Sequence, residues 1–159
     1  MSTYVFNATD PVNGTELWIT DGTEAGTVLL KDIAAGTASS NPSVLFRLAD
    51  GKVLFSANDG VNGVELWVTD GTGAGTMMLK DINLGATGSS PASFFRMDSN
   101  AVLFTATDAV NGQELWMTDG TEAGTVLLKD IKAGTSNSFS YGFADLGNGT
   151  VLFSAADTV

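Results

Sequence analysis

The segment TDGTEAGTVLLKDI at residues 20–33 decides the fold, because it returns letter for letter at residues 118–131. A third copy at residues 69–82 differs from it only at Gly73, Met77 and Met78. The spacing between copies is 49 residues, without insertion or deletion. A fixed period of this length is typical of repeat architectures, so the sequence predicts three repeats of 49 residues with 12 residues remaining.

Each repeat contains four short segments rich in β-branched and aromatic residues, separated by turn residues. In the central copy these segments are residues 44–48, 53–57, 64–69 and 76–82. Asp-Gly and Asn-Gly pairs between them favour tight hairpins. Apolar side chains fall on both faces of the segments, which is typical of a sheet covered on both sides. The sequence therefore predicts an all-β chain of four-stranded antiparallel meanders.

A meander of this length, packed face to face with copies of itself, is the blade of a β-propeller. We expect one repeat domain over residues 1–159, with repeats at about 4–52, 53–101 and 102–150, and residues 151–159 duplicating the first strand. The alternative is a β-trefoil, which also uses three four-stranded repeats. Three blades cannot close a ring, so we expect a homo-oligomer, with two chains giving six blades favoured over three chains giving nine.

Composition excludes several classes of function. The chain has no Cys and no His, which removes disulfides, thiolate metal sites, the commonest zinc ligand and any Ser-His-Asp triad. A formal charge of −11 disfavours nucleic acid and anionic lipid as partners. No apolar run approaches the roughly 20 residues that span a bilayer, and the N-terminus lacks the pattern of a secretory signal, so we expect no membrane insertion and no signal peptide.

The motif ELWITDGT at residues 16–23 has counterparts at residues 65–72 and 114–121. It resembles the ELWxxDGT repeat of large bacterial proteins, many of them secreted or at the cell surface, and the resemblance covers essentially the whole chain. The resemblance implies a propeller-like array and an extracellular or cell-surface location. It implies no particular activity, because that family is defined by its repeat.

Two carboxylates and an amide recur at the hairpin between the second and third segments of each repeat. Because this hairpin and the connection between repeats leave a meander on the same side, we expect these groups near the hydroxyl-rich loops at residues 37–40, 87–90 and 135–138. Hard oxygen ligands suit Ca²⁺, although the spacing is not that of an EF-hand. A hydrogen-bonded hairpin, a cation site and a ligand contact all stay open for Asp10, Asn13, Glu16, Asp59, Asn62, Glu65, Asp108, Asn111 and Glu114.

Two further sets recur in each repeat and favour structural roles over chemistry. Aspartates that lead the Gly-Thr turns can accept local hydrogen bonds, so we expect Asp21, Asp70 and Asp119 to hold turns closed rather than bind metal. Tryptophans in mid-strand indicate packing between blades rather than platforms for sugar stacking, and these are Trp18, Trp67 and Trp116.

Catalytic sites place distinct groups in distinct protonation states, whereas every candidate carboxylate here recurs in all three copies. We therefore expect no enzyme, no catalytic residue and no obligatory cofactor. Repeated identical sites suit multivalent binding. The leading interpretation is a binding or scaffold propeller with carbohydrate or Ca²⁺ as candidate ligands. The alternatives are a purely structural or engineered repeat array and a β-trefoil lectin.

Overall fold

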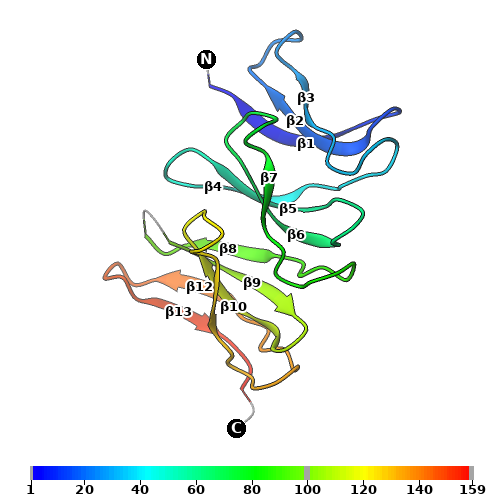
Figure 1. Ribbon diagram of the computed structural model, residues 1–159. Helices are drawn as coiled ribbons and strands as arrows, with labels where there is room; N and C mark the ends of the chain where they lie inside the picture. Colours follow the sequence, from blue (N-terminus) through cyan, green and yellow to red (C-terminus); the bar gives the residue numbers. More distant parts are fainter. Residues whose placement is uncertain (1, 99–100, 158–159) are drawn as a thin grey trace.

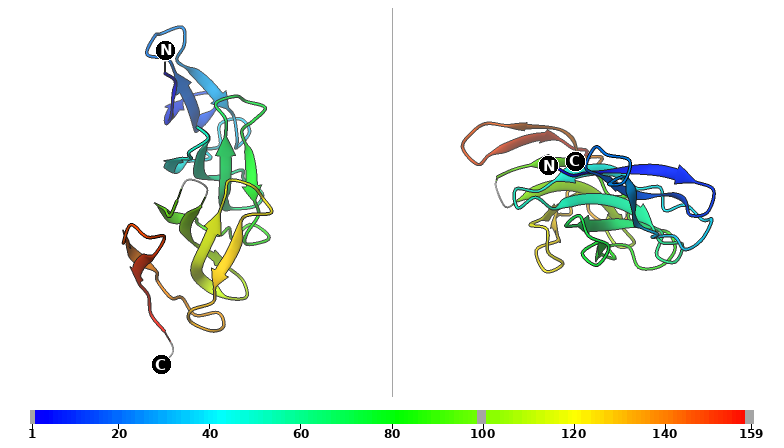
Figure 2. Two further views of the ribbon diagram at one scale, coloured as in Figure 1. Left: turned by 90° about the vertical axis from the view of Figure 1, so that its left-hand side faces the viewer. Right: turned by 90° about the horizontal axis from the view of Figure 1, so that it is seen from above.

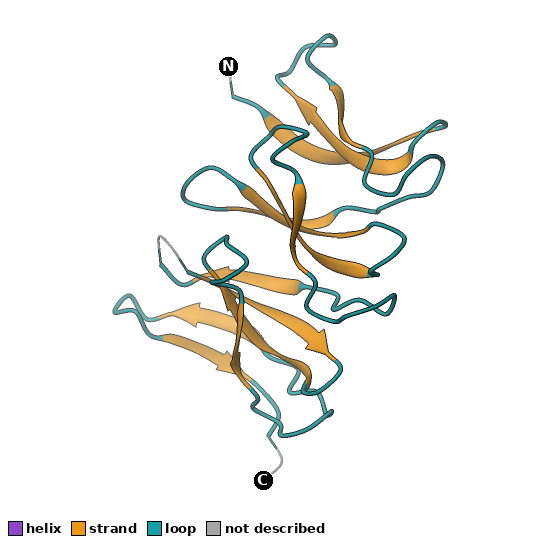
Figure 3. Ribbon diagram, in the orientation of Figure 1, coloured by secondary structure: helices purple, strands orange, loops and turns teal. Residues whose placement is uncertain are grey.

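The computed structural model describes residues 2–98 and 101–157, and within these ranges the chain is entirely β, with 13 strands and no helix (Figures 1 and 3). No segment of the described residues is therefore a helix that could cross a membrane. The strands form four antiparallel sheets. Sheet 1 contains β1 (Tyr4–Asp10), β2 (Gly14–Thr20) and β3 (Val28–Lys31). Sheet 2 contains β4 (Ser43–Arg47), β5 (Val53–Asn58), β6 (Val64–Thr69) and β7 (Met77–Lys80).

Sheet 3 repeats sheet 2, and sheet 4 contains only the first half of the pattern. Sheet 3 contains β8 (Ala92–Arg96), β9 (Val102–Asp108), β10 (Gly112–Thr118) and β11 (Val126–Lys129), and sheet 4 contains β12 (Tyr141–Asp145) and β13 (Val151–Ser154). Strand order follows chain order in every sheet, which confirms the predicted meander. The last strand, β13, pairs with β12 as β5 pairs with β4, so the strand that duplicates β1 forms a hairpin within its own chain.

The four sheets follow one another along the molecule, so that the N-terminus lies at one end of the stack and the C-terminus at the other (Figures 1 and 2). The first strands of sheets 2 and 3, β4 and β8, contact each other on one side of the stack. The described residues close neither a barrel nor a ring, so the stack is open at both ends.

Alternation along the strands gives each sheet two apolar faces. We call one the tryptophan face, formed by Phe6, Ala8 and Trp18 in sheet 1, by Phe55, Ala57 and Trp67 in sheet 2, and by Phe104, Ala106 and Trp116 in sheet 3. The opposite side is the leucine face, formed by Val5, Leu17 and Ile33 in sheet 1, by Leu54, Leu66 and Ile82 in sheet 2, and by Leu103, Leu115 and Ile131 in sheet 3.

The tryptophan faces of sheets 2 and 3 each pack on the leucine face of the preceding sheet. The tryptophan face of sheet 2 and the leucine face of sheet 1 form one buried cluster, in which Trp67 is joined by Leu17 and Ile33. The tryptophan face of sheet 3 and the leucine face of sheet 2 form the other. The core is thus built twice from the same interface, and burial of apolar surface there stabilises the stack by about 25 cal/mol per Å².

Candidate functional site

The glutamates of the repeated ELW motif are fully buried, although they are charged residues. Glu16 lies on β2, and its carboxylate reaches the loop between sheets 1 and 2. It accepts hydrogen bonds from the backbone N–H groups of Ile33 at 2.9 Å, Ala34 at 3.2 Å and Ser40 at 2.9 Å, and from the hydroxyl of Ser40 at 2.5 Å. A buried carboxylate is tolerated when its lone pairs are satisfied in this way.

The same arrangement recurs in the next two repeats. Glu65 accepts from Ile82 N at 3.0 Å, Asn83 N at 3.1 Å and Ser89 Oγ at 2.5 Å. Glu114 accepts from Ile131 N at 3.0 Å and Ser138 N at 3.1 Å. Each glutamate therefore fastens the loop that leads to the next sheet, and the predicted proximity of the hairpin acids to the hydroxyl-rich loops is confirmed for these three residues.

Close backbone packing supports the contact between hairpin and loop. Gly14 begins β2 with a φ of 70°, and a Cβ at this position would lie 2.2 Å from the carbonyl oxygen of Ala38. The N–H of Thr15, the next residue, donates to Ser39 Oγ at 2.9 Å. Only glycine fits this position, because it permits both the left-handed φ and the close approach.

Burial raises the pKa of Glu65, because desolvation disfavours the carboxylate more than its hydrogen bonds from Ser89, Ile82 and Asn83 favour it. The negative charge of Asp81 adds to the upward shift. The carboxyl group of Glu65 thus accepts three hydrogen bonds and still favours its protonated form more than a free glutamate does. The Glu65 carboxyl group is closed off from solvent, so its hydrogen bonds and its raised pKa both belong to the interior of the fold.

The aspartates of the hairpin tips belong to a separate hydrogen-bond system. Asp10 Oδ1 accepts from Val12 N at 2.7 Å and Asn13 N at 2.8 Å, and Oδ2 accepts from Asn13 Nδ2 at 2.9 Å. The side-chain bond from Asn13, followed by the two backbone bonds, lowers the pKa of Asp10. The other two tips repeat these bonds at Asp59 with Asn62 and at Asp108 with Asn111.

The nine candidate ligands therefore form two sets. The aspartates and asparagines hold the hairpin tips, and the buried glutamates anchor the loops between sheets. Backbone N–H groups point their positive ends at the carboxylate oxygens in both sets, where a cation would otherwise bind. Among the described residues no group of three or more acidic side chains is arranged to hold a metal ion. The geometry supports hydrogen bonding within the fold as the use of these oxygens.

The Asp-Gly-Thr turns are closed by hydrogen bonds of their own. Asp70 Oδ1 accepts from Thr72 N at 2.8 Å and Thr72 Oγ1 at 2.7 Å, and Gly75 N donates to Thr72 Oγ1 at 2.9 Å. The hydroxyl groups of Thr69 and Thr76 pair at 2.7 Å beneath the turn. The same bonds surround Asp21 and Asp119, and the hydroxyl and N–H of the following threonine lower the pKa of all three aspartates.

The three tryptophans are not equivalent. Trp67 and Trp116 are 6% exposed within the two inter-sheet clusters, where the sequence predicts them. Trp18 is only half-buried and belongs to neither cluster, because no sheet covers the tryptophan face of sheet 1 in the described chain. Within the single chain, Trp18 therefore departs from the expected inter-blade position.

The serines that donate to the glutamates lie in the hydroxyl-rich loops, although the sequence pattern indicates the loops and not the individual serines. Ser40, Ser89 and Ser138 each follow their glutamate by 24 residues, so the signal is a constant spacing inside the repeat. In comparisons with known proteins, the chain matches no family model, no curated protein and no solved structure.

Proposed function

We propose that this chain is a non-enzymatic scaffold of propeller-type blades that binds through several copies of one loop. The observation that carries the proposal is the repeated apolar tip of the hairpin between the second and third strands of a blade. Val12, Val61 and Val110 occupy the same place in the three tips and are 67%, 70% and 71% exposed. A single exposed valine needs no explanation, but the same one in three identically held tips favours a repeated contact.

The tips are held rigidly enough to act together. The N–H of each valine donates to the aspartate two residues before it, at 2.7, 2.9 and 2.8 Å in chain order. The loops beside the tips are anchored by the buried glutamates. Weak contacts on a rigid array add up by effective concentration, so modest affinity at one tip suffices.

The internal use of the carboxylates supports a role other than catalysis. An acid–base pair requires groups that reach a substrate, whereas Glu16, Glu65 and Glu114 are buried against backbone donors. The charge of −11 favours neutral ligands over anionic ones, and a neutral glycan at a bacterial surface is the class that we propose. The extracellular setting follows from the resemblance of the ELWxxDGT repeat alone.

A glycan array probed with the unmodified chain tests this function, together with a triple variant Val12→Ser, Val61→Ser and Val110→Ser. We expect a glycan signal that the triple variant loses and that each single variant only weakens. A matched variant, Val28→Ser, changes an exposed valine on β3 away from the tips and should retain the signal. A silent array, or equal loss in the triple and the Val28→Ser chains, would overturn the proposal.

Calorimetric titration with Ca²⁺ separates the other ligand class. We expect no heat of binding, because the carboxylate oxygens already accept hydrogen bonds. A stoichiometric signal that Asp10→Asn, Asp59→Asn and Asp108→Asn abolish together would instead establish a cation-binding protein and contradict the proposed use of the tips.

A further inference from the structure

We infer that β12 of one copy of this chain pairs with the open edge of β1 in a second copy, reciprocally, so that two chains close a ring of six four-stranded blades. This pairing is independent of what the hairpin tips bind. It rests on an unpaired strand edge, a cavity and an arginine at the position of the additional strand, and on one uncovered and one incompletely covered sheet face at the two ends of the stack.

The unpaired edge belongs to β1. In sheets 2 and 3 the second strand pairs on both sides, β5 with β4 and β6, and β9 with β8 and β10. Among the described residues β1 pairs only with β2. Exposed strand edges are templates for pairing with another chain. The position of the first strand of a blade is therefore open in sheet 1.

The register of the added strand follows from the pairs inside the chain. Phe46 pairs with Leu54 and Arg47 with Val53, and 49 residues later Phe95 pairs with Leu103 and Arg96 with Val102. The corresponding residues of β12 and β1 place Ala144 opposite Val5 and Asp145 opposite Tyr4. A shift by one residue would reverse every side chain, so this register is the one that the two faces permit.

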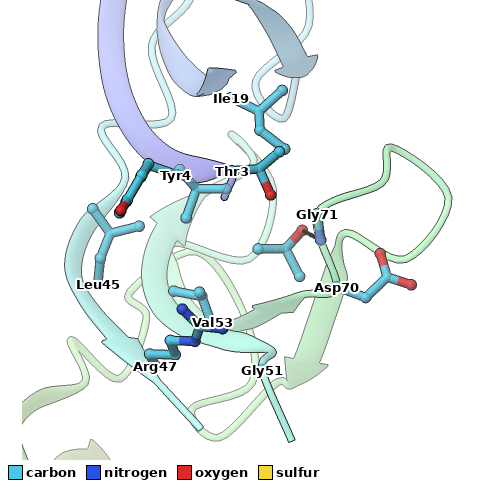
Figure 4. Close-up of a pocket in the computed structure, with 11 residues that line it drawn as sticks. Thr3, Tyr4, Ile19, Leu45, Arg47, Gly51, Val53, Asp70 and Gly71 are labelled. Atoms are coloured by element: carbon cyan, nitrogen blue, oxygen red, sulfur yellow. Dashed lines mark hydrogen bonds between the residues drawn. The ribbon is translucent and has the colours of Figure 1, made fainter. Parts of the chain in front are cut away.

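A cavity of about 220 Å³ lies between sheets 1 and 2 at this open position (Figure 4). It is lined by Tyr4, Ile19, Arg47 and Gly71 among others. At the next interface Leu48 enters the corresponding space, because its Cδ1 lies against Gly120, which corresponds to Gly71. The counterpart of Leu48 at the open position is Leu146 of the second copy.

The exposure of these two leucines agrees with that assignment. Leu48 is 7% exposed, whereas Leu146 is 53% exposed in the single chain. A Cβ on Gly71 would meet only Ile19 Cδ1, at 3.7 Å, so the cavity has room for an incoming side chain. Burying a leucine there removes apolar surface from water and favours association.

Arg47 supplies a polar contact for the added strand. At the next interface Arg96 donates to the backbone carbonyl oxygen of Arg47, and its guanidinium lies 5.3 Å from the centre of the Phe46 ring. Arg47 lines the cavity, where the corresponding carbonyl would be that of Asp145 in the second copy (Figure 4). At the next interface the residue beneath the arginine is itself an arginine, Arg47. At the open position it is Asp145, whose negative charge attracts the guanidinium of Arg47.

The two ends of the stack are complementary, because one presents a tryptophan face and the other a leucine face. The tryptophan face of sheet 1 is uncovered, whereas the equivalent faces of sheets 2 and 3 each pack on the leucine face of another sheet. The leucine face of sheet 3 is incompletely covered, since Leu128 is 46% exposed while its counterpart Leu79 is 7% exposed. Strands β2 and β3 of a second copy would cover it. The two ends of one chain lie far apart, so the partner is another copy (Figure 1).

Strand β13 is the element that the exchange displaces. It duplicates β1 and holds the same edge of β12 within its own chain. Its ladder spans four residues, with Leu152 and Phe153 exposed, whereas β1 pairs with β2 over seven residues. Among the described residues β13 is held by β12 alone, whereas β1 is also held by β2, so the exchange moves β12 from a two-stranded sheet to the edge of a three-stranded one.

Light scattering on the unmodified chain, at roughly 0.15 M salt to screen the charge of each copy, gives the first test. We expect a mass of twice 16.4 kDa at high protein concentration. Leu146→Gln should raise the dissociation constant at least tenfold, and Leu146→Met, which keeps the apolar volume, should not. A monomer at all concentrations, or an assembly of three or more chains, would overturn the two-chain ring.

Disulfide trapping tests the strand itself, and the chain has no cysteine to interfere. A Tyr4→Cys chain is mixed with an Asp145→Cys chain, unfolded and refolded together, and oxidised. We expect a disulfide-linked pair of the two different chains, since residues opposite each other in a ladder are within bridging distance. The matched control, Glu122→Cys on an exposed turn, should form no bridge with Tyr4→Cys. Dimers without the expected bridge would overturn the exchange of β12.

Discussion

The hydroxyl of Ser89 donates to Glu65 Oε2 at 2.5 Å, and both side chains are closed off from solvent. Ser89 lies in the loop that leads into sheet 3, while Glu65 lies on the third strand of sheet 2. The contact therefore fixes where one sheet begins relative to the sheet before it. Ser40 and Glu16 make the same bond between sheets 1 and 2.

Glu65→Gln should destabilise the fold. The amide keeps one acceptor oxygen but turns an NH₂ group toward N–H and O–H donors, leaving buried groups unpaired at a cost of about 1–3 kcal/mol. Urea unfolding measures the loss. The matched control is Glu24→Gln on an exposed turn, which should change the free energy of unfolding by less than about 0.5 kcal/mol. Equal effects of the two substitutions would show that the Glu65 contact contributes nothing.

The pKa of Glu65 predicts a dependence of stability on pH. An acid whose pKa is higher in the folded chain stabilises the fold fully below its unfolded pKa, and this contribution is lost as pH rises through the folded value. For Glu65 the loss begins near the ordinary value of 4.5 and continues upward, because burial raises the folded pKa. Urea unfolding between pH 4.5 and 7 should show this fall, and Glu65→Gln should reduce it.

Asp70 should make stability depend on pH in the opposite direction to Glu65. The hydroxyl and N–H of Thr72 lower its pKa, so its stabilising contribution is present above the ordinary value of 3.8 and is lost as pH falls through the folded value. Asp70→Asn should therefore lower the free energy of unfolding above about pH 4.5, where the charged carboxylate contributes, and flatten its fall below about pH 4. Profiles of Glu65→Gln and Asp70→Asn that keep the pH dependence of the unmodified chain would contradict both assignments.

The sequence predicted the strands well because local signals agree with one another. Residues 64–69 were expected as a strand and form β6 with the same ends. Residues 76–82 were expected as one strand, but β7 covers only Met77–Lys80. The strand ends early because the N–H of Ile82 leaves the ladder and donates to Glu65, a residue 17 positions away. A hydrogen bond of that range has no local signal.

The candidate site was predicted in position but not in detail. The repeat placed the acids beside the hydroxyl-rich loops, and alternation along β6 and β10 placed Trp67 and Trp116 between sheets. Period and alternation do not reveal which carboxylate oxygens are already occupied, since that depends on how the loop folds back. They also do not reveal the left-handed φ of Val44 and Ser93 near the start of β4 and β8, where the register shifts.

Gly75→Ala should destabilise the turn between β6 and β7. A Cβ at Gly75 would lie 2.1 Å from Asp70 Oδ1, so the carboxylate would have to leave its bonds with Thr72. We expect a loss of roughly 1–3 kcal/mol in urea unfolding. The matched variant is Gly73→Ala in the same turn, where the nearest atom would be 3.1 Å away and φ is not left-handed, and its effect should be clearly smaller. A larger loss for Gly73→Ala would refute the role of the Asp70 turn.

Trp67→Ala and Trp18→Ala should differ although the two residues hold the same place in the repeat. Trp67 is buried between sheets 1 and 2, so its truncation should lower the free energy of unfolding by about 3–5 kcal/mol at any protein concentration. Trp18 lies on the uncovered face of sheet 1, so its truncation should cost much less in dilute solution, where single chains prevail.

At high concentration the Trp18→Ala variant should lose the dimer instead. The closed ring places Trp18 against the leucine face of a second copy, as Trp116 packs against that of sheet 2. Light scattering should then show at least a tenfold weaker association, while circular dichroism of the dilute variant matches the unmodified chain. The effect separates the two roles, because a tryptophan that only stabilises its own chain would lower stability equally at every concentration. Equal losses for Trp18→Ala and Trp67→Ala in dilute solution would contradict the uncovered face.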